Sequence, residues 1–311
     1  MSYFIKKILA LILTLFLAAT VTFFLFQVLP GDSALSKLGT SATEESVEAL
    51  RKAYGLDRSL PEQFFSWLSG AVRGDFGNSM QYGVSVGSLM SGRLVTTLTL
   101  AAMSFFIIII VSFPLGIIAA GRPGGVVDSV IFAMSQFFMA IPSFFLGMLL
   151  TLVFGIILKW FTPGNFVDYS ADPAGFIRAL VFPAISIAIP KIAMTVKYLR
   201  NSILREKQLD YCRTARSKGA GKKTVMLDHV LKNALIPVIT FLGLILSEIV
   251  AGSIIVEQVF NIPGVGRMLV TAILNRDLPV VQAGVLYVAA AVILISYLAD
   301  MLYKIVDPRV G

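Results

Sequence analysis

The chain has 311 residues, of which 57% are hydrophobic and 14% are charged, and its formal net charge is +8. An ordinary soluble protein carries about 25% charged residues, so this composition excludes that class. One cysteine, Cys212, and one histidine, His229, exclude a disulfide framework and a Cys/His metal cluster within the chain.

Long apolar runs predict an all-α integral membrane protein. A helix that crosses about 30 Å of hydrocarbon needs roughly 20 residues. Two runs of sufficient length contain charges, namely 179–199 with Lys191 and Lys197, and 234–256 with Glu248. Four more runs contain no formal charge: 8–29, 94–120, 129–158 and 279–299. We therefore predict six transmembrane helices. The first run is longer than the apolar part of a cleaved signal peptide, so we expect it to be retained.

Residues 31–93 are predicted to form an external helical segment after the first span. Ser41, with a glutamate three residues later, fits a capping box for a helix that Gly55 ends. Ser59 begins a second helix, which carries several aromatic residues and ends at Gly74. We expect these amphipathic helices to pack on the spans rather than to lie alone in the lipid headgroups. The predicted division is 1–93, the first span with this segment, and 94–311, a five-helix core.

Positive charge is concentrated between the fourth and fifth spans. Ten Lys or Arg residues and three acidic residues lie between Lys197 and Lys232. The positive-inside rule places this segment in the cytoplasm, and an even number of spans then places both termini there. Such a loop is basic by default, so we do not predict a nucleic-acid partner.

Two short motifs are similar to enzyme motifs but lack the required context. The stretch GAGKKT at 219–224 has Arg216 where a phosphate-binding loop needs a glycine, and no strand pattern precedes it. GVSVG at 83–87 fits a nucleophile elbow. In the predicted topology Ser85 is separated by the membrane from His229, the chain's one histidine. We therefore predict no catalytic residues, no metal site and no enzymatic activity.

The basic segment has features of a docking surface. Its residues 209–218 favour a helix that Gly219 ends, and a second helical run covers 222–235. Ala215 and Gly219 are four positions apart, so they are predicted to share a flat face. Charges that flank this face come from Arg213, Arg216 and Lys218. An ordinary basic loop explains the same residues, so both interpretations stay open at this point.

A family resemblance favours the docking interpretation. DYCRTARSKG at 210–219, followed by HVLKNALIP at 229–237, resembles the EAA loop of ABC-importer permeases, in the form found in B-type subunits of the dipeptide/oligopeptide/nickel family. Two positions depart from the family pattern, Lys232 and Val95, where prolines are expected. Further blocks of the family occur in the expected order along the chain: LPGD (29–32), GLDRSLPEQFFSWL (55–68), GDFGNS (74–79), IPSFFLG (141–147), VFNIPGVGR (259–267) and DPRV (307–310).

The resemblance implies a type I ABC importer permease fold and a multi-pass subunit of the cytoplasmic (inner) membrane. Its implied function is import of di- or oligopeptides by alternating access, with nickel or a metal chelate as the alternative cargo. Implied partners are a second related permease, two ATPases that hold ATP and Mg²⁺, and an external binding protein, whereas this chain itself has no cofactor. Coupling helices are implied at about 203–232, with these residues contacting the ATPases: Asp210, Arg213, Thr214, Ala215, Arg216, Lys218 and Gly219.

A transporter that works without ATP is the alternative from another functional class. Such proteins place ionisable residues near mid-membrane, as Lys191, Glu248 and Asp300 are placed here. For Glu248 two interpretations are open. It either lines the transport pathway together with Lys191, or it pairs with Lys191 or a partner group to hold helices together.

Overall fold

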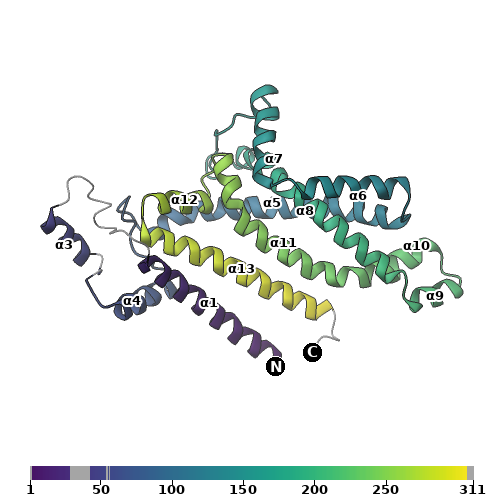
Figure 1. The fold of residues 1–311 in the computed structure, drawn as a ribbon, viewed down its shortest axis with the longest axis horizontal. Helices are drawn as coiled ribbons and strands as arrows, with labels where there is room; N and C mark the ends of the chain where they lie inside the picture. The colour runs from purple at the N-terminus through teal and green to yellow at the C-terminus, as the bar shows by residue number, and fades with distance from the viewer. Residues whose placement is uncertain (1, 29–42, 54, 56, 307–311) are drawn as a thin grey trace. The chain divides into compact units, whose positions relative to one another are not determined.

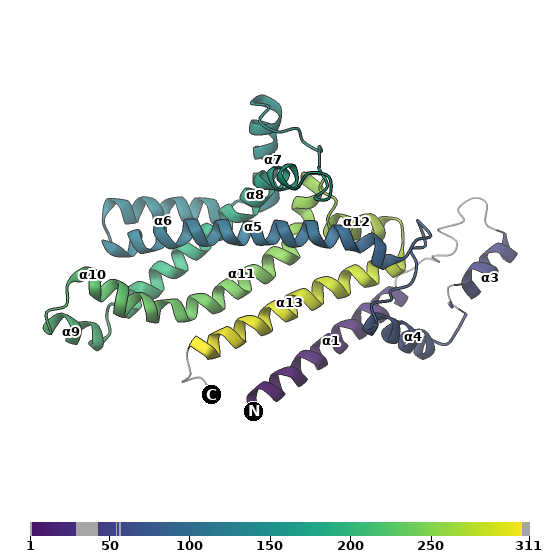
Figure 2. The same cartoon turned by 180° about the vertical axis from the view of Figure 1, so that it is seen from behind.

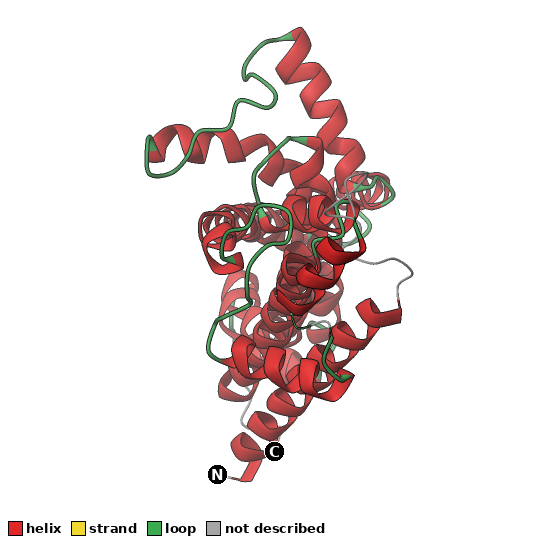
Figure 3. Ribbon diagram, turned by 90° about the vertical axis from the view of Figure 1, so that its left-hand side faces the viewer, coloured by secondary structure: helices red, strands yellow, loops and turns green. Residues whose placement is uncertain are grey.

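The fold is all-helical. The computed structural model describes residues 2–28, 43–53, 55 and 57–306, and among these no strand longer than one isolated bridge, Asn78 with Ser85, occurs. Figures 1 and 3 show helices joined by loops. The elements in chain order are α1 (Ser2–Val28), α3 (Glu44–Ala53), α4 (Leu60–Val72), α5 (Val86–Gly121), α6 (Val126–Met139), α7 (Ser143–Leu150), π-helical η2 (Thr151–Ile157), α8 (Pro173–Glu206), α9 (Asp210–Ser217), α10 (Lys222–Thr224), π-helical η3 (Val225–Leu231), α11 (Lys232–Val259), α12 (Val265–Leu274) and α13 (Leu278–Val306).

The predicted spans are present, but the third is not one straight helix. Five helices of the described chain are long and apolar enough to cross a membrane, and the pair α6 and α7–η2, bent by 94°, has the length and composition of a sixth, broken span or of a re-entrant loop. Pro142 lies at this bend, directly before α7. Proline has no N–H group and disfavours helical backbone in the residue before it, so the helix that was predicted over 129–158 is interrupted.

The fourth span is longer than its apolar run indicated. Helix α8 begins at Pro173, where the Asp172 carboxylate accepts a hydrogen bond from the Ala174 amide at 3.0 Å. It contains 34 residues, which at 1.5 Å per residue gives about 50 Å and exceeds the roughly 30 Å of hydrocarbon. Charged residues at both ends had limited the predicted span to 179–199.

Contacts divide the chain into two compact units, and each is described by itself. One contains residues 1–98 and 262–293, and the other contains 99–261 and 294–311. Residues 262–293 therefore group with the N-terminal segment and not with the rest of the predicted core, 94–311.

Within the first unit, α4 packs on α1 through aromatic side chains. Phe64 of α4 is buried and its ring lies 5.3 Å from that of Phe23 and 6.2 Å from that of Phe16. The Ser59 amide donates to the Glu62 carboxylate at 3.1 Å, which caps α4 as predicted. Packing of this amphipathic helix on a span is thereby confirmed. Helix α3 ends before Gly55 as expected, while its predicted cap, Ser41, lies outside the described residues.

A buried carboxylate joins the loop between α4 and α5 to the turn between α12 and α13. Asp277, whose exposed fraction is 1%, accepts hydrogen bonds from the Met80 amide at 2.9 Å and the Gln81 amide at 3.3 Å. It also accepts the hydroxyl hydrogen bond of Ser79. Since a buried carboxylate needs such donors, Asp277 determines where residues 79–81 lie.

Within the second unit, one buried cluster joins the ends of five elements. Its members come from α5, α8, α9, η3 and α11: Ala120, Leu199, Ile203, Cys212, Val225, Val230, Ala234, Val238 and Leu242. Helices α9 and α10 lie beside the ends of α8 and α11 that this cluster joins (Figure 2).

We expect Asp277→Ala to lower the thermal stability of the purified protein. The substitution leaves buried donors of residues 79–81 without an acceptor, at about 1–3 kcal/mol for each unsatisfied group. The midpoint of thermal unfolding in detergent should fall by about 5 °C or more, on a scale of about 2–4 °C per kcal/mol. Asp57→Ala removes an exposed carboxylate and should change the midpoint by about 1 °C or less. Equal midpoints for the two variants would contradict this role of Asp277.

Candidate functional site

The predicted docking helix and its terminating glycine are present. Helix α9 ends at Ser217, and Gly219 has a φ angle of +84°, which side-chain-bearing residues rarely adopt. The Gly219 amide donates to the Arg216 carbonyl at 3.0 Å, and the Ala220 amide donates to the Ala215 carbonyl at 3.1 Å. The stretch GAGKKT thus contains the turn after α9 and the three residues of α10, and a helix rather than a strand precedes it.

One side of α9 is held against the end of α8. Cys212 is fully buried and its thiol donates to the Glu206 carbonyl at 3.3 Å. The Tyr211 hydroxyl donates to the Glu206 carboxylate at 2.6 Å. Burial raises the pKa of the Tyr211 hydroxyl, and the hydrogen bond to Glu206 raises this pKa further. These contacts fix the orientation of α9 relative to α8.

Ala215 lies on this inner side of α9. It is partly buried and packs against the cluster that contains Cys212. Gly219 lies beyond the helix, where an added Cβ atom would meet nothing within 4 Å. The structure therefore differs from the expectation that Ala215 and Gly219 share one open flat face. The inward position of Ala215 follows from its spacing of three residues from the buried Cys212.

The opposite side of α9 is open and basic. Arg213, Arg216 and Lys218 are exposed, as are Thr214 and Asp210. Arg213 lies 3.6 Å from Asp210, with exposed side-chain fractions of 79% and 95%. So exposed a pair contributes little to stability and leaves both groups available to a partner. These five sequence-predicted coupling residues are all exposed, and their coupling role stays a prediction.

Two polar contacts join α8 to the end of α5 and the start of α6. No local sequence pattern marks them. Arg200 of α8 binds Asp128 through two nitrogen–oxygen contacts of 2.5 and 2.6 Å, and the Gly124 amide donates to the same carboxylate at 2.8 Å. Lys207 donates to the Ala120 carbonyl at the end of α5. Burial lowers the pKa of the Lys207 ammonium, and the neighbouring charge of Arg216 lowers this pKa further.

Lys191 of α8 and Glu248 of α11 form an ion pair. The exposed side-chain fractions are 23% for Lys191 and 53% for Glu248 in the isolated subunit. The structure thus contains the helix-joining pair that was one of the two interpretations of Glu248. The other interpretation, in which Glu248 and Lys191 line a pathway, stays a prediction and is compatible with the exposure of Glu248.

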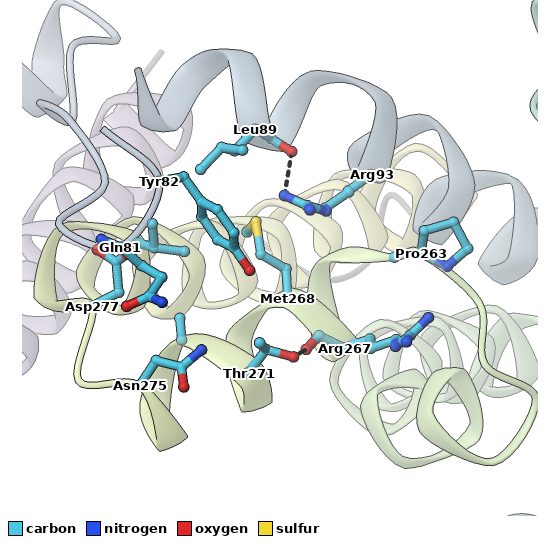
Figure 4. A pocket seen from close by; sticks show the side chains of 13 residues that line it. Gln81, Tyr82, Leu89, Arg93, Pro263, Arg267, Met268, Thr271, Asn275 and Asp277 are labelled. Carbon is cyan, nitrogen blue, oxygen red and sulfur yellow. Dashed lines mark hydrogen bonds between the residues drawn. The ribbon is translucent and has the colours of Figure 1, made fainter. Parts of the chain in front are cut away.

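A second feature missed from the sequence is a pocket of about 250 Å³ in the first unit. Figure 4 shows Tyr82 pointing from the loop before α5 toward Met268 of α12, with Arg93 of α5 above Met268. Arg267 of α12 and Asp277 also line this pocket. Arg267 falls in the block VFNIPGVGR, but no sequence pattern indicated that it lies near Tyr82 and Arg93, which are far from it in the chain.

Neither enzyme-like motif acquires a catalytic setting within the described residues. Ser85 lies in the isolated bridge with Asn78, directly before α5, and not at a strand–turn–helix elbow. In the described part of the chain, no group of three or more His, Cys, Asp or Glu residues could hold a metal ion.

Comparisons with known proteins identify the family. A family model described as "Binding-protein-dependent transport system inner membrane component" matches residues 112–311, and the corresponding N-terminal model matches residues 1–101. The chain is 36% identical over 306 residues to a protein of Brucella abortus (strain 2308) whose name describes a peptide transport system permease, covering 98% of each chain. It is 34% identical over 312 residues to the oligopeptide transport system permease protein AppB of Bacillus subtilis (strain 168), covering 99% of each.

A solved structure shares the fold. This is the MetNI methionine ABC transporter in inward facing conformations, with a TM-score of 0.53 and 20% sequence identity over 68% of this chain and 93% of the other. The predicted type I importer permease fold is thereby confirmed.

We expect the charges of Lys191 and Glu248 to stabilise each other. Lys191→Glu places two carboxylates side by side and should reduce the recovery of monodisperse protein several-fold, as measured by size-exclusion chromatography. The double substitution Lys191→Glu/Glu248→Lys reverses the pair and should restore most of the recovery, with a coupling energy of about 1 kcal/mol. Lys191→Glu combined with Asp57→Lys, a change at an exposed carboxylate, is the matched control and should restore nothing. Equal recovery of the two double variants would contradict the pair.

Proposed function

Because the chain belongs to the family of binding-protein-dependent transport system inner membrane components, we propose that it forms half of the translocation pathway of an ATP-driven peptide importer. One observation carries the coupling part of this proposal. Helix α9 is held on α8 by one side, and the basic residues on the rest of its surface are exposed. Peptide cargo is supported by the peptide and oligopeptide transport named for the relatives from Brucella abortus and Bacillus subtilis.

The proposed topology places both termini and α9 in the cytoplasm, and α3, α4 and α12 outside. Contacts within each unit support it. Asp277 binds Ser79 and its neighbours, and the topology puts both segments outside. Lys207 binds the end of α5 and Arg200 binds the start of α6, and the topology puts these groups at the cytoplasmic end. The concentration of Lys and Arg between Lys197 and Lys232 agrees with this orientation.

In the proposed mechanism, two partner ATPases bind ATP and Mg²⁺ and close against each other, and α9 moves with them. Because Tyr211 and Cys212 both bind Glu206 at the end of α8, movement of α9 is passed to α8 directly. The side chains proposed to contact the ATPases are those on the open side and in the turn: Asp210, Arg213, Thr214, Arg216, Lys218 and Gly219. Rotation of α8 and its neighbours then alternates access between the two sides of the membrane.

A second, related permease would complete the pathway. Glu248 is more than half exposed in the isolated subunit although it lies within an apolar span, which supports a position facing a partner or a water-filled path. A carboxylate there favours cationic groups, such as the amino terminus of a peptide. On this proposal Glu248→Gln lowers uptake of cationic peptides more than uptake of neutral ones in fully assembled complexes.

We expect Gly219→Trp to abolish transport without preventing assembly. Gly219 has a positive φ angle and open space around it, so a bulky side chain there strains the turn and obstructs the ATPase. In proteoliposomes with the partner subunits and binding protein, ATP-dependent uptake of a labelled oligopeptide should fall more than about tenfold, the loss expected when about 1.4 kcal/mol of coupling is removed.

Gly219→Asn is the matched control, because asparagine tolerates positive φ angles better than most residues and is small. It should retain most of the uptake. Normal uptake by Gly219→Trp would contradict the coupling role of this turn. Absence of peptide uptake by the wild-type complex, with ATPase activity intact, would contradict the peptide cargo.

A further inference from the structure

The pocket of Figure 4 is a positively charged recess with a rigid wall. It lies within the first unit and is lined by residues of the external loop, α5, α12 and the turn before α13. Asp277 is the acidic residue among the described residues that line it. Its carboxylate already accepts hydrogen bonds from Ser79, Met80 and Gln81. The carboxylate therefore anchors the wall of the pocket, and its one negative charge stands against the two positive charges of Arg93 and Arg267 in the lining.

Two arginines contribute the positive charge. Arg93 is half-buried, and its guanidinium donates one hydrogen bond, to the Leu89 carbonyl at 2.9 Å. A guanidinium carries five N–H donors in a planar fork, so Arg93 retains the capacity to bind a carboxylate through two further donors. Arg267 is close enough for its charge to repel that of Arg93. An anion in the pocket would relieve this repulsion.

The size of the pocket indicates what kind of anion fits. Its volume of about 250 Å³ is below the roughly 300–1,000 Å³ typical of pockets that enclose a whole small-molecule ligand. One side chain that enters from a partner surface fits this space. Further hydrogen bonds to such a group can come from three other polar residues that line the pocket, Gln81, Tyr82 and Asn275.

We propose that this pocket receives a carboxylate side chain, aspartate or glutamate, of the external binding protein when that protein docks on the permease. The proposal rests on the proposed function, which places the pocket on the external side. Arg93 is the anchor for this side chain, because arginine that binds a carboxylate in a partly desolvated pocket is a frequent source of specific binding energy between proteins. Charge complementarity thereby aligns the binding protein with the outer ends of α5 and α12.

The test measures ATPase stimulation of the reconstituted complex at increasing concentrations of its peptide-loaded binding protein. We expect Arg93→Gln to raise the half-saturating concentration about tenfold, the effect of losing one charge-assisted contact, and to leave the maximal rate unchanged. Arg93→Lys keeps the charge but loses the planar fork, so its half-saturating concentration should be intermediate. Arg73→Gln removes an exposed charge outside the pocket and is the matched control, with a change of about twofold or less.

Salt supplies a second measurement. Raising the ionic strength should increase the half-saturating concentration of the binding protein more for wild type than for Arg93→Gln. Salt screens the charge of Arg93, which the variant lacks. Equal half-saturating concentrations for wild type, Arg93→Gln and Arg73→Gln would overturn the proposal. A second result would also overturn it. If ATPase stimulation of Arg93→Gln stayed below that of wild type at saturating binding protein, and this difference disappeared with carboxyl-amidated peptides, the pocket would bind the carboxylate of the cargo instead. Failure of the proposed function is distinguishable, because the wild-type complex itself would then show no stimulation.

Discussion

The ion pair between Asp128 and Arg200 is the contact on which the arrangement of α5, α6 and α8 around α9 depends. Asp128 has an exposed fraction of 3% and binds Arg200 through two close contacts and the Gly124 amide through a third. A charge buried at this depth is costly unless its hydrogen-bonding capacity is used, so the α5–α6 turn and α8 must keep their relative positions. Helix α9 is attached to the same end of α8 through Glu206. A displacement of α9 is therefore transmitted to α8, which the Asp128–Arg200 pair holds in place.

In the first unit, too, a buried carboxylate holds segments that are far apart in the chain. Asp277 collects its donors from residues almost two hundred positions earlier in the chain and thereby holds the loop that forms one wall of the arginine-lined pocket. Irregular backbone is tolerated near a membrane where its polar groups are satisfied within the protein. Each unit thus combines apolar spans with a buried carboxylate that positions the segments proposed to meet partners.

The sequence predicted those features that depend on local properties. Apolar length predicted the spans, and the positive φ angle of Gly219 agrees with its predicted role in ending α9. The 94° bend at Pro142 was not predicted, because the apolar run continues through it. The pairs Asp128–Arg200 and Asp277–Ser79 join residues separated by 72 and 198 positions. No local pattern marks such partners, so the bracing of α8 and the pocket at Arg93 required the structure.

The central claim is that the open side of α9 docks on the ATPase. A photo-activatable amino acid in place of Arg213 tests it directly in the assembled transporter, with the same group in place of Arg73 as the control, since both positions are exposed. The account predicts a crosslink from position 213 to the ATPase subunit, with a yield that changes when ATP binds, and none from position 73. A crosslink to the ATPase from position 73, or to the external binding protein from position 213, would contradict it.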